Sequence, residues 1–273
     1  MPSVRALAFA LSAALALAAP AAALAARAPE GPSRGSFRAG SLSGGVRVPD
    51  EGLDHYLLFP PRCAGTTTAD ANAWGHPRVV ETVLAVARDV RRALPSAARL
   101  AVGDLSGREG GKIPHHLSHQ NGLDVDVWFG GRALPSPEAL TAPPAPTARA
   151  GELTRCVYPR GYEERDPATT RWRVADAFDP ELVWRMAEGF AARPEVKIIF
   201  VGGLIREALA AWAKDHGVPA KARARTLGKL YAVFCRPPKG VVMDSYRGNW
   251  CPHDDHLHVR FRCPRDSPTC RDR

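Results

Sequence analysis

The chain has 273 residues, 45% of them hydrophobic, which is enough to bury one sizeable core in one or two domains. Its formal net charge of +9 comes mostly from arginine, and indicates a solvated basic surface or attraction to a polyanion such as a carboxylate-bearing cell wall. The sequence has no helix-turn-helix pattern, no zinc-finger spacing and no basic stretch interleaved with stacking aromatics, so nucleic acid is not an expected partner.

Residues 1–26 are expected to be a secretory signal peptide. Arg5 gives a positive start, an alanine-dominated apolar run follows from Ala6, and the small residues Ala23–Ala26 suit signal peptidase. An uncleaved anchor is the alternative, but alanine inserts weakly and Pro20 interrupts the run. We therefore expect export to the periplasm, with no stable membrane insertion after cleavage.

The next segment, residues 27–50, carries Gly, Ser, Pro and Arg without periodicity, and we expect an extended or disordered arm there. The rest of the chain, residues 51–273, is expected to form the folded domain. Apolar residues recur at helical spacing between Trp74 and Leu94, and they predict an amphipathic helix stopped by Pro95. Arg99–Leu105 comes next as a predicted strand.

The second half of the chain alternates irregular and regular segments. Residues 131–171 are too long and irregular for an ordinary connection, so this insertion is either functional or disordered. Asp179 followed by proline opens a predicted helix that ends before Pro194. A strand at Val196–Val201 and a helix at Leu204–His216 come next. This order of elements predicts an α+β fold, with helices packed against a mainly antiparallel sheet.

The chain contains six cysteines, an even number that favours disulfides in an exported protein. They are Cys63, Cys156, Cys235, Cys251, Cys263 and Cys270. The pair Cys263–Cys270 is the easiest to argue, because the interval is short and two prolines make it a turn. Cys235–Cys251 and Cys63–Cys156 are the remaining guesses.

One stretch, Ser118–Trp128, has the pattern of a turn followed by a strand. An Asn-Gly turn signal precedes a run that alternates polar and apolar residues from Gly122 onward, which is the period of a half-buried strand. One face takes Leu123, Val125 and Val127, and the other takes Asp124, Asp126 and Trp128. His119 therefore lies at the turn, and two carboxylates point to one side of the strand.

A second strand with the same design is predicted at His256–Phe261. One face takes His256, His258 and Arg260, and the other takes Leu257, Val259 and Phe261. If both apolar faces enter one core, the imidazoles and carboxylates of the two strands converge in one cleft. Imidazoles and a carboxylate at one point are typical of a zinc site on the sheet face, with a fourth position open for water.

These motifs resemble those of a known family. His119 and Asp126, with six residues between them, followed much later by His-x-His, resemble the lysostaphin and D-alanyl-D-alanine carboxypeptidase-like zinc peptidases. More narrowly, the sequence resembles penicillin-insensitive murein endopeptidase over roughly residues 38–273. The motifs that carry this are Ser118–Asp126, Gly103–Leu105, Gly110-Gly111 and His253–Arg260. The resemblance makes residues 51–273 the expected zinc peptidase domain.

The resemblance and the strand faces together give the expected site. His119, Asp126 and His258 are the expected zinc ligands. His256 lies about 6–7 Å along the strand from His258, beside the metal, where it is expected to act in catalysis by taking a proton or stabilising the oxyanion. The resemblance gives His256 the same role and also supports the Cys263–Cys270 disulfide.

Three further residues have less defined expected roles. His116 resembles the first histidine of the family's His-x-x-His run, and is either a ligand of an additional or alternative metal or a substrate contact. His253 either holds the site together or contacts substrate. Asp124 shares the face of Asp126 and is expected to orient a ligand histidine from behind.

The resemblance implies a periplasmic zinc endopeptidase that hydrolyses the D-alanyl–meso-diaminopimelyl cross-link of peptidoglycan, which is the expected partner. The Ser-x-x-Lys of penicillin-binding proteins is missing, so a β-lactam has no serine to acylate. Two alternatives stay open: a zinc-bearing cell-wall binding module without peptidase activity, and a D,D-carboxypeptidase or dipeptidase of the same superfamily. The presence of His256 and Asp255 favours an enzyme.

Overall fold

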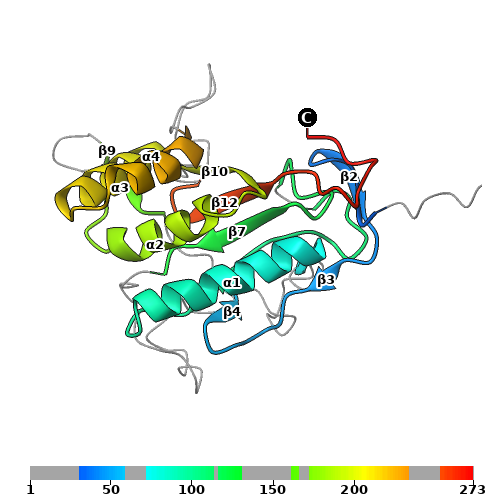
Figure 1. The fold of residues 1–273 in the computed structure, drawn as a ribbon, viewed down its shortest axis with the longest axis horizontal. Coiled ribbons are helices and arrows are strands. Elements are labelled where there is room, and N and C mark those ends of the chain that lie inside the picture. The colour runs from blue at the N-terminus through cyan, green and yellow to red at the C-terminus, as the bar shows by residue number, and fades with distance from the viewer. Residues whose placement is uncertain are drawn as a thin grey trace, which may run out of the picture.

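The computed structural model describes residues 31–58, 72–113, 116–130, 161–165, 172–233 and 253–272. Its centre is a six-stranded sheet (Figure 1). The strand order is β11 (Leu230–Val233), β10 (Val196–Gly202), β12 (His256–Phe261), β7 (Asp124–Trp128), β6 (Leu100–Val102) and β4 (His55–Leu57). The central pairings, β10 with β12, β12 with β7 and β7 with β6, are antiparallel. The edge pairings, β11 with β10 and β6 with β4, are parallel. The predicted α+β class with a mainly antiparallel sheet is confirmed.

Within the described residues four helices accompany this sheet; in Figure 1 α1 runs alongside β7, and α2 lies next to the ends of β7 and β12. They are α1 (Pro77–Ala93), α2 (Pro180–Ala191), α3 (Gly203–Asp215) and α4 (Ala220–Lys229). The valines of α1 point into the same core as Val125 and Val259 of the central strands. The predicted start of α2 is confirmed, since the Asp179 carboxylate accepts a hydrogen bond of 3.0 Å from the amide of Leu182.

The register between β7 and β12 decides which side chains share a face. Val125 pairs with Val259 on the apolar face, while Asp126 pairs with His258 on the polar face. All five residues of β7 are buried, so the prediction of a half-buried strand is wrong. The polar face of the strand is covered as well, and its carboxylates lie inside the protein.

Part of this cover comes from the segment that composition predicted to be an extended or disordered arm. The prediction is wrong for the part that the structure describes, because β1 (Ser33–Ser36) and β2 (Ala39–Leu42) form a hairpin. Backbone hydrogen bonds tie the hairpin to the C-terminal segment: the amide of Gly35 donates to Thr269 O at 3.1 Å, and the amide of Arg271 donates to Gly35 O at 2.7 Å.

Two further two-stranded sheets complete the described elements. One pairs β3 (Val46–Arg47) with β5 (Trp74–Gly75), and the other pairs β8 (Glu163–Arg165) with β9 (Trp172–Val174). The proposed signal peptide, the four cysteines outside the Cys263–Cys270 pair and most of the 131–171 insertion lie outside the described residues. Among the helices that are described, none is long and apolar enough to cross a membrane.

Cys263 and Cys270 form a disulfide. It closes the turn between the end of β12 and the segment that pairs with the β1–β2 hairpin. A short loop of this kind loses less chain entropy on folding when it is already closed in the unfolded state.

Replacing both cysteines by serine should therefore lower the free energy of unfolding by about 2 kcal/mol. Denaturant unfolding of the exported protein and of the Cys263→Ser/Cys270→Ser variant measures the difference. An unchanged denaturant midpoint would show that the disulfide does not contribute to stability.

Candidate metal centre and active site

Asp126, in the middle of β7, is the centre of a cluster of histidines. Its Oδ1 lies 2.9 Å from His258 Nδ1 and 3.6 Å from His256 Nε2. Its Oδ2 lies 3.4 Å from His119 Nε2 and 3.8 Å from His116 Nδ1. The structure thus brings together four histidines from two distant parts of the sequence around one carboxylate.

This carboxylate is 1% exposed, and burial by itself would raise its pKa. The charges of His119, His256 and His258 outweigh burial and hold the pKa well below its usual range. In the described part of the chain, both ring nitrogens of the fully buried His119 have no hydrogen-bond partner, and Oδ1 of Asp126, although close to two imidazoles, makes no hydrogen bond of good geometry. Buried nitrogen and oxygen atoms whose lone pairs point to one place, with no hydrogen-bond donor to satisfy them, are suited to binding a cation.

The closest set of candidate ligands includes His116. One ligand atom each from His116, His119 and Asp126 lie within 4.8 Å of one another. His258 shares Asp126 with this group through its 2.9 Å contact. Nitrogen and carboxylate donors in this combination suit zinc among the common metals. The donor set therefore fits the metal that the sequence pattern indicated.

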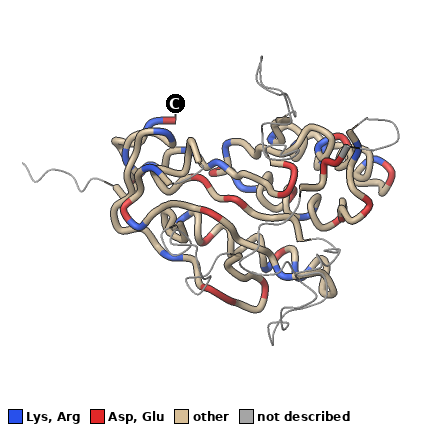
Figure 2. The backbone as a smooth tube through the Cα atoms, turned by 180° about the vertical axis from the view of Figure 1, so that it is seen from behind, with Lys and Arg blue, Asp and Glu red and all other residues tan. Residues whose placement is uncertain are grey.

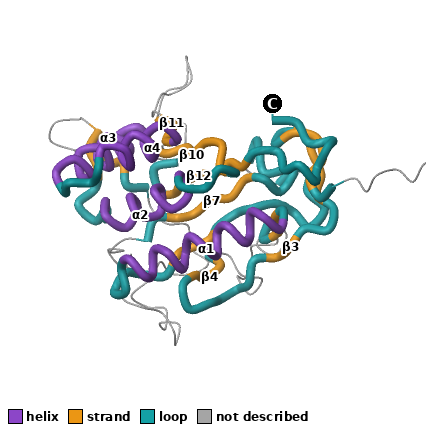
Figure 3. The backbone as a smooth tube through the Cα atoms, viewed as in Figure 1, coloured by secondary structure: helices purple, strands orange, loops and turns teal. Residues whose placement is uncertain are grey.

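His119 is held in place by an unusual backbone. Its φ of +71° lies in the left-handed region, which residues with side chains adopt rarely. Its amide donates to Asp124 Oδ2 at 3.1 Å, and the Asn-Gly turn behind it gives Gly122 a φ of +71° as well. This turn leads into β7, which lies beside β12 in the sheet (Figure 3).

Asp124, the first residue of β7, links this strand to β12 through its carboxylate. Besides the His119 amide, its carboxylate lies 3.4 Å from His258 Nε2 and accepts hydrogen bonds of 2.7 and 3.2 Å from Arg260. Burial would raise its pKa, but His258, His119 and Arg260 hold it well below the usual value. Because His258 points Nδ1 at Asp126 and Nε2 at Asp124, Asp124 fixes the orientation of this ring.

Arg260 links the histidine cluster to the N-terminal hairpin, a contact that the sequence pattern did not reveal. Its guanidinium lies 3.6 Å from the centre of the Phe37 ring, at the tip of the β1–β2 hairpin, and 5.2 Å from that of Phe200. One of its terminal nitrogens is 3.4 Å from His258 Nε2. The only sequence signal was that Arg260 shares a strand face with the two histidines.

His256 is paired with the neighbouring Asp255. The Asp255 carboxylate lies 2.5 Å from His256 Nδ1, which leaves Nε2 directed toward Asp126. The ring also contacts Trp128, with centroids 4.9 Å apart. A carboxylate on one ring nitrogen fixes the tautomer and the orientation of the imidazole. His256 is therefore positioned beside the cluster with one nitrogen available for proton transfer.

His253 stands on the other side of His256 and also has a left-handed backbone, with a φ of +64°. Its ring lies 5.0 Å from that of His256, 5.4 Å from that of His258 and 5.9 Å from that of Phe200. Burial, together with the neighbouring His256 and His258, lowers its pKa to about 2. His253 is therefore a neutral imidazole that can donate one hydrogen bond.

His116 has a carboxylate partner of its own. Its Nε2 lies 3.2 Å from Asp104 Oδ2, and Asn72 donates a hydrogen bond of 3.0 Å to Asp104 Oδ1. Asp104 belongs to the Gly-Asp-Leu motif that the sequence singled out without giving it a role. It turns Nδ1 of His116 toward Asp126, so His116 belongs to the cluster.

Comparison with known proteins places the chain among the peptidases that hydrolyse peptidoglycan. A family model described as penicillin-insensitive murein endopeptidase matches residues 33–223, and the chain belongs to this family. Proteins with that name are 28% identical over 247 residues in Pectobacterium atrosepticum and 27% identical over 243 residues in Yersinia enterocolitica. The first alignment covers 88% of this chain and 68% of the relative, and the second covers 87% and 68%.

The Arg260–Asp124 pair can be tested with a substitution that keeps the charge. Arg260→Lys loses the two-bond contact with Asp124 and the planar contact with Phe37, so metal affinity should fall by about tenfold. Competition with a chromophoric chelator measures the affinity. The control is Arg262→Lys, an exposed position two residues further on, which should not change it. Equal affinities in all three proteins would remove Arg260 from the support of the site.

A second prediction concerns Asp254, which is 1% exposed and lies next to Asp255 and Glu163. Burial and these carboxylates raise its pKa to about 8. The folded protein thus keeps a proton that the unfolded chain, with a pKa near 3.9, releases. Stability from this residue is present below pH ~4 and is lost as the pH rises toward 8.

Asp254→Asn should therefore stabilise the protein at pH 8 by on the order of 1–3 kcal/mol, with little effect at pH 4. Thermal unfolding of the two proteins at both values measures it. A wild-type melting temperature that rises between pH 5 and 8 relative to the variant would contradict the raised pKa.

Proposed function

We propose that the chain is a periplasmic zinc metallopeptidase that hydrolyses D-alanyl–meso-diaminopimelyl cross-links of peptidoglycan. One observation carries the proposal: a buried Asp126 faces ring nitrogens of four histidines in a member of a murein endopeptidase family. In this proposal residues 1–26 are the signal peptide. The peptidase domain proposed for 51–273 is extended to include the hairpin at 33–42, which packs on the site through Phe37.

His119, Asp126 and His258 are the proposed zinc ligands, and His116 is a proposed further ligand. The unpartnered ring nitrogens of His119 and the contact between His258 Nδ1 and Asp126 support this set. When bound, zinc supplies the Lewis acidity that polarises a scissile carbonyl and makes water a better nucleophile. Asp124 and Asp104 keep the rings of His258 and His116 in the orientation that binding requires.

His256 is the proposed catalytic residue. Asp255 holds its Nδ1, so Nε2 faces the cluster and can take the proton of the attacking water. The same nitrogen then returns the proton to the amine that leaves when the peptide bond breaks. His253, neutral and adjacent, is a proposed hydrogen-bond donor to the oxyanion or to another part of the substrate.

Two substitutions on one strand separate metal binding from catalysis. His258→Ala should lose both zinc and activity, because it removes a ligand. His256→Ala should keep about one zinc per chain and lose roughly 10²–10⁴ in rate, which is the usual contribution of a general base or oxyanion donor. Turnover of a cross-linked muropeptide dimer, together with zinc content by mass spectrometry, gives both results.

The outcomes distinguish the candidate functions. Equal rates for His256→Ala and wild type at matched zinc content would remove His256 from the mechanism. Zinc that stays bound in His258→Ala would refute the ligand set. A wild-type protein that binds the dimer without cleaving it would be a binding module, and release of terminal D-alanine alone would identify a carboxypeptidase.

A further inference from the structure

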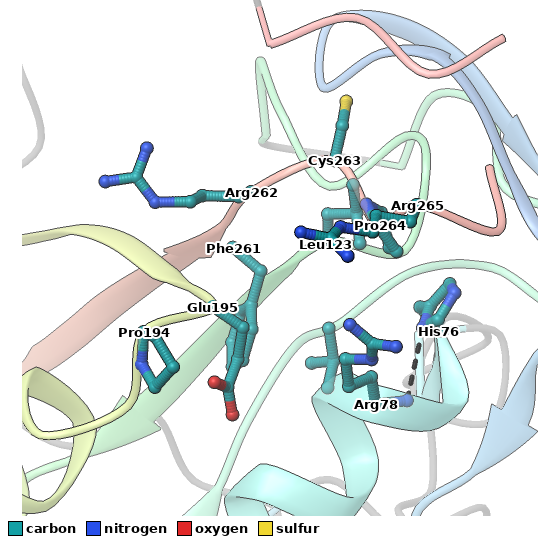
Figure 4. Close-up of a pocket in the computed structure, with 11 residues that line it drawn as sticks. His76, Arg78, Leu123, Pro194, Glu195, Phe261, Arg262, Cys263, Pro264 and Arg265 are labelled. Atoms are coloured by element: carbon teal, nitrogen blue, oxygen red, sulfur yellow. Dashed lines mark hydrogen bonds between the residues drawn. The ribbon is translucent and has the colours of Figure 1, made fainter. Parts of the chain in front are cut away.

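A groove of about 460 Å³ lies on the helical side of the sheet, away from the metal centre (Figure 4). It is bounded by the start of α1, by the segment that enters β10 and by the segment that leaves β12. Its lining residues are His76, Arg78, Val79, Leu123, Pro194, Glu195, Phe261, Arg262, Cys263, Pro264 and Arg265. Leu123 and Phe261 belong to the apolar faces of the motif strands, whose opposite faces carry Asp124 and Asp126.

The groove combines an apolar floor with a basic rim. Val79, Leu123 and Phe261 are buried and form the floor, whereas Arg78, Arg262 and Arg265 are exposed. Throughout the described residues, none of these three guanidinium groups has a hydrogen bond or ion pair within the chain. In Figure 4 Arg262 extends on one side of the groove, and Arg78 and Arg265 lie on the other. Arginines at the rim without an internal partner are available for carboxylates of another molecule.

One acidic side chain, Glu195, lies among the arginines. Thr82 donates a hydrogen bond of 3.0 Å to its Oε1, and no other side chain among the described residues donates to this carboxylate, so Oε2 can accept from a ligand. Burial lowers the pKa of the His76 imidazole, although Asp266, 3.3 Å from its Nε2, acts in the opposite direction, so His76 adds little to the charge of the groove. The groove therefore presents three guanidinium groups and one carboxylate, so it suits a ligand that bears several carboxylates together with an amine or amide N–H.

The backbone that carries these side chains is fixed. The amide of Arg78 donates to His76 Nδ1 at 3.1 Å in the first turn of α1. The amide of Arg262 donates to Glu195 O at 2.8 Å, and the Cys263–Cys270 disulfide closes the loop beyond it. Because the first amides of α1 are already occupied, a ligand would meet the guanidinium groups rather than the helix end.

We propose that this groove binds an acidic peptide stem of peptidoglycan other than the stem that is being cleaved. Such stems carry carboxylates for the arginines, amines and amides for Glu195, and alanine methyls for the apolar floor. The inference rests on the proposed substrate class, and it gives the protein a second contact with the same polymer. Basic residues also occur at the other end of the molecule, around α3 and α4 (Figure 2), and these supply a matched control.

The test compares two triple variants that remove the same charge. The groove variant is Arg78→Ala/Arg262→Ala/Arg265→Ala, and the control is Lys214→Ala/Lys221→Ala/Arg225→Ala, at exposed positions of α3 and α4. Binding to purified peptidoglycan sacculi is measured by co-sedimentation in the cold over a range of salt concentrations. The groove variant should bind about tenfold more weakly than the control, and its binding should depend less on salt.

Three further measurements identify the ligand. Amidation of the sacculus carboxylates should reduce binding of wild type to that of the groove variant. Turnover of a small muropeptide dimer should be unchanged in the groove variant, since the groove lies on the opposite side of the sheet from His256. Vesicles containing phosphatidylglycerol should not bind through the groove; arginine-dependent binding to vesicles but not to sacculi would assign a lipid surface instead.

Equal sacculus binding by the groove and control variants would overturn the inference. That result is distinct from failure of the proposed function, which would appear as no cleavage of the muropeptide dimer by the wild-type protein.

Discussion

The antiparallel register between β7 and β12 is the constraint on which the site depends. It sets His258 opposite Asp126 and Arg260 opposite Asp124, and at the same time it sets Val259 opposite Val125 in the core. A shift by one residue would turn the apolar side chains of one strand toward the carboxylates of the other. The hydrophobic core and the polar cluster are therefore specified by the same pairing, and neither can form without the other.

Each buried carboxylate of the site needs a positively charged or hydrogen-bonding partner to offset the cost of removing it from water. Asp126 has imidazole nitrogens on both oxygens, and Asp124 has the guanidinium of Arg260. Arg260 in turn lies against the rings of Phe37 and Phe200, so the N-terminal hairpin is packed on the layer that supports the metal ligands. An unpaired charge at this depth would cost several kcal/mol, which explains why the cluster is extended rather than limited to three ligands.

The left-handed backbone of His119 and His253 serves the same cluster. Both residues belong to it, and each lies just before one of the two central strands. Conformations of this kind cost on the order of 1–3 kcal/mol and persist where the surroundings hold them. Here the His119 amide is bonded to Asp124, and the carbonyl of His253 accepts from Gly202 at 2.6 Å. The two turns thus aim side chains into the cluster from outside the strands.

The sequence by itself determined the features that depend on local period and residue type. Alternation placed Asp126 and His258 on the polar faces of their strands, and Asp179 before Pro180 marked the start of α2. The sequence could not reveal contacts that form only when distant segments meet. The hairpin at 33–42 has no periodicity of its own and is held by residues 267–271 at the other end of the chain. In the same way, only the tertiary structure decided that Phe37 covers Arg260 and that Asp104 turns His116 toward Asp126, because each pair is remote or irregular in sequence.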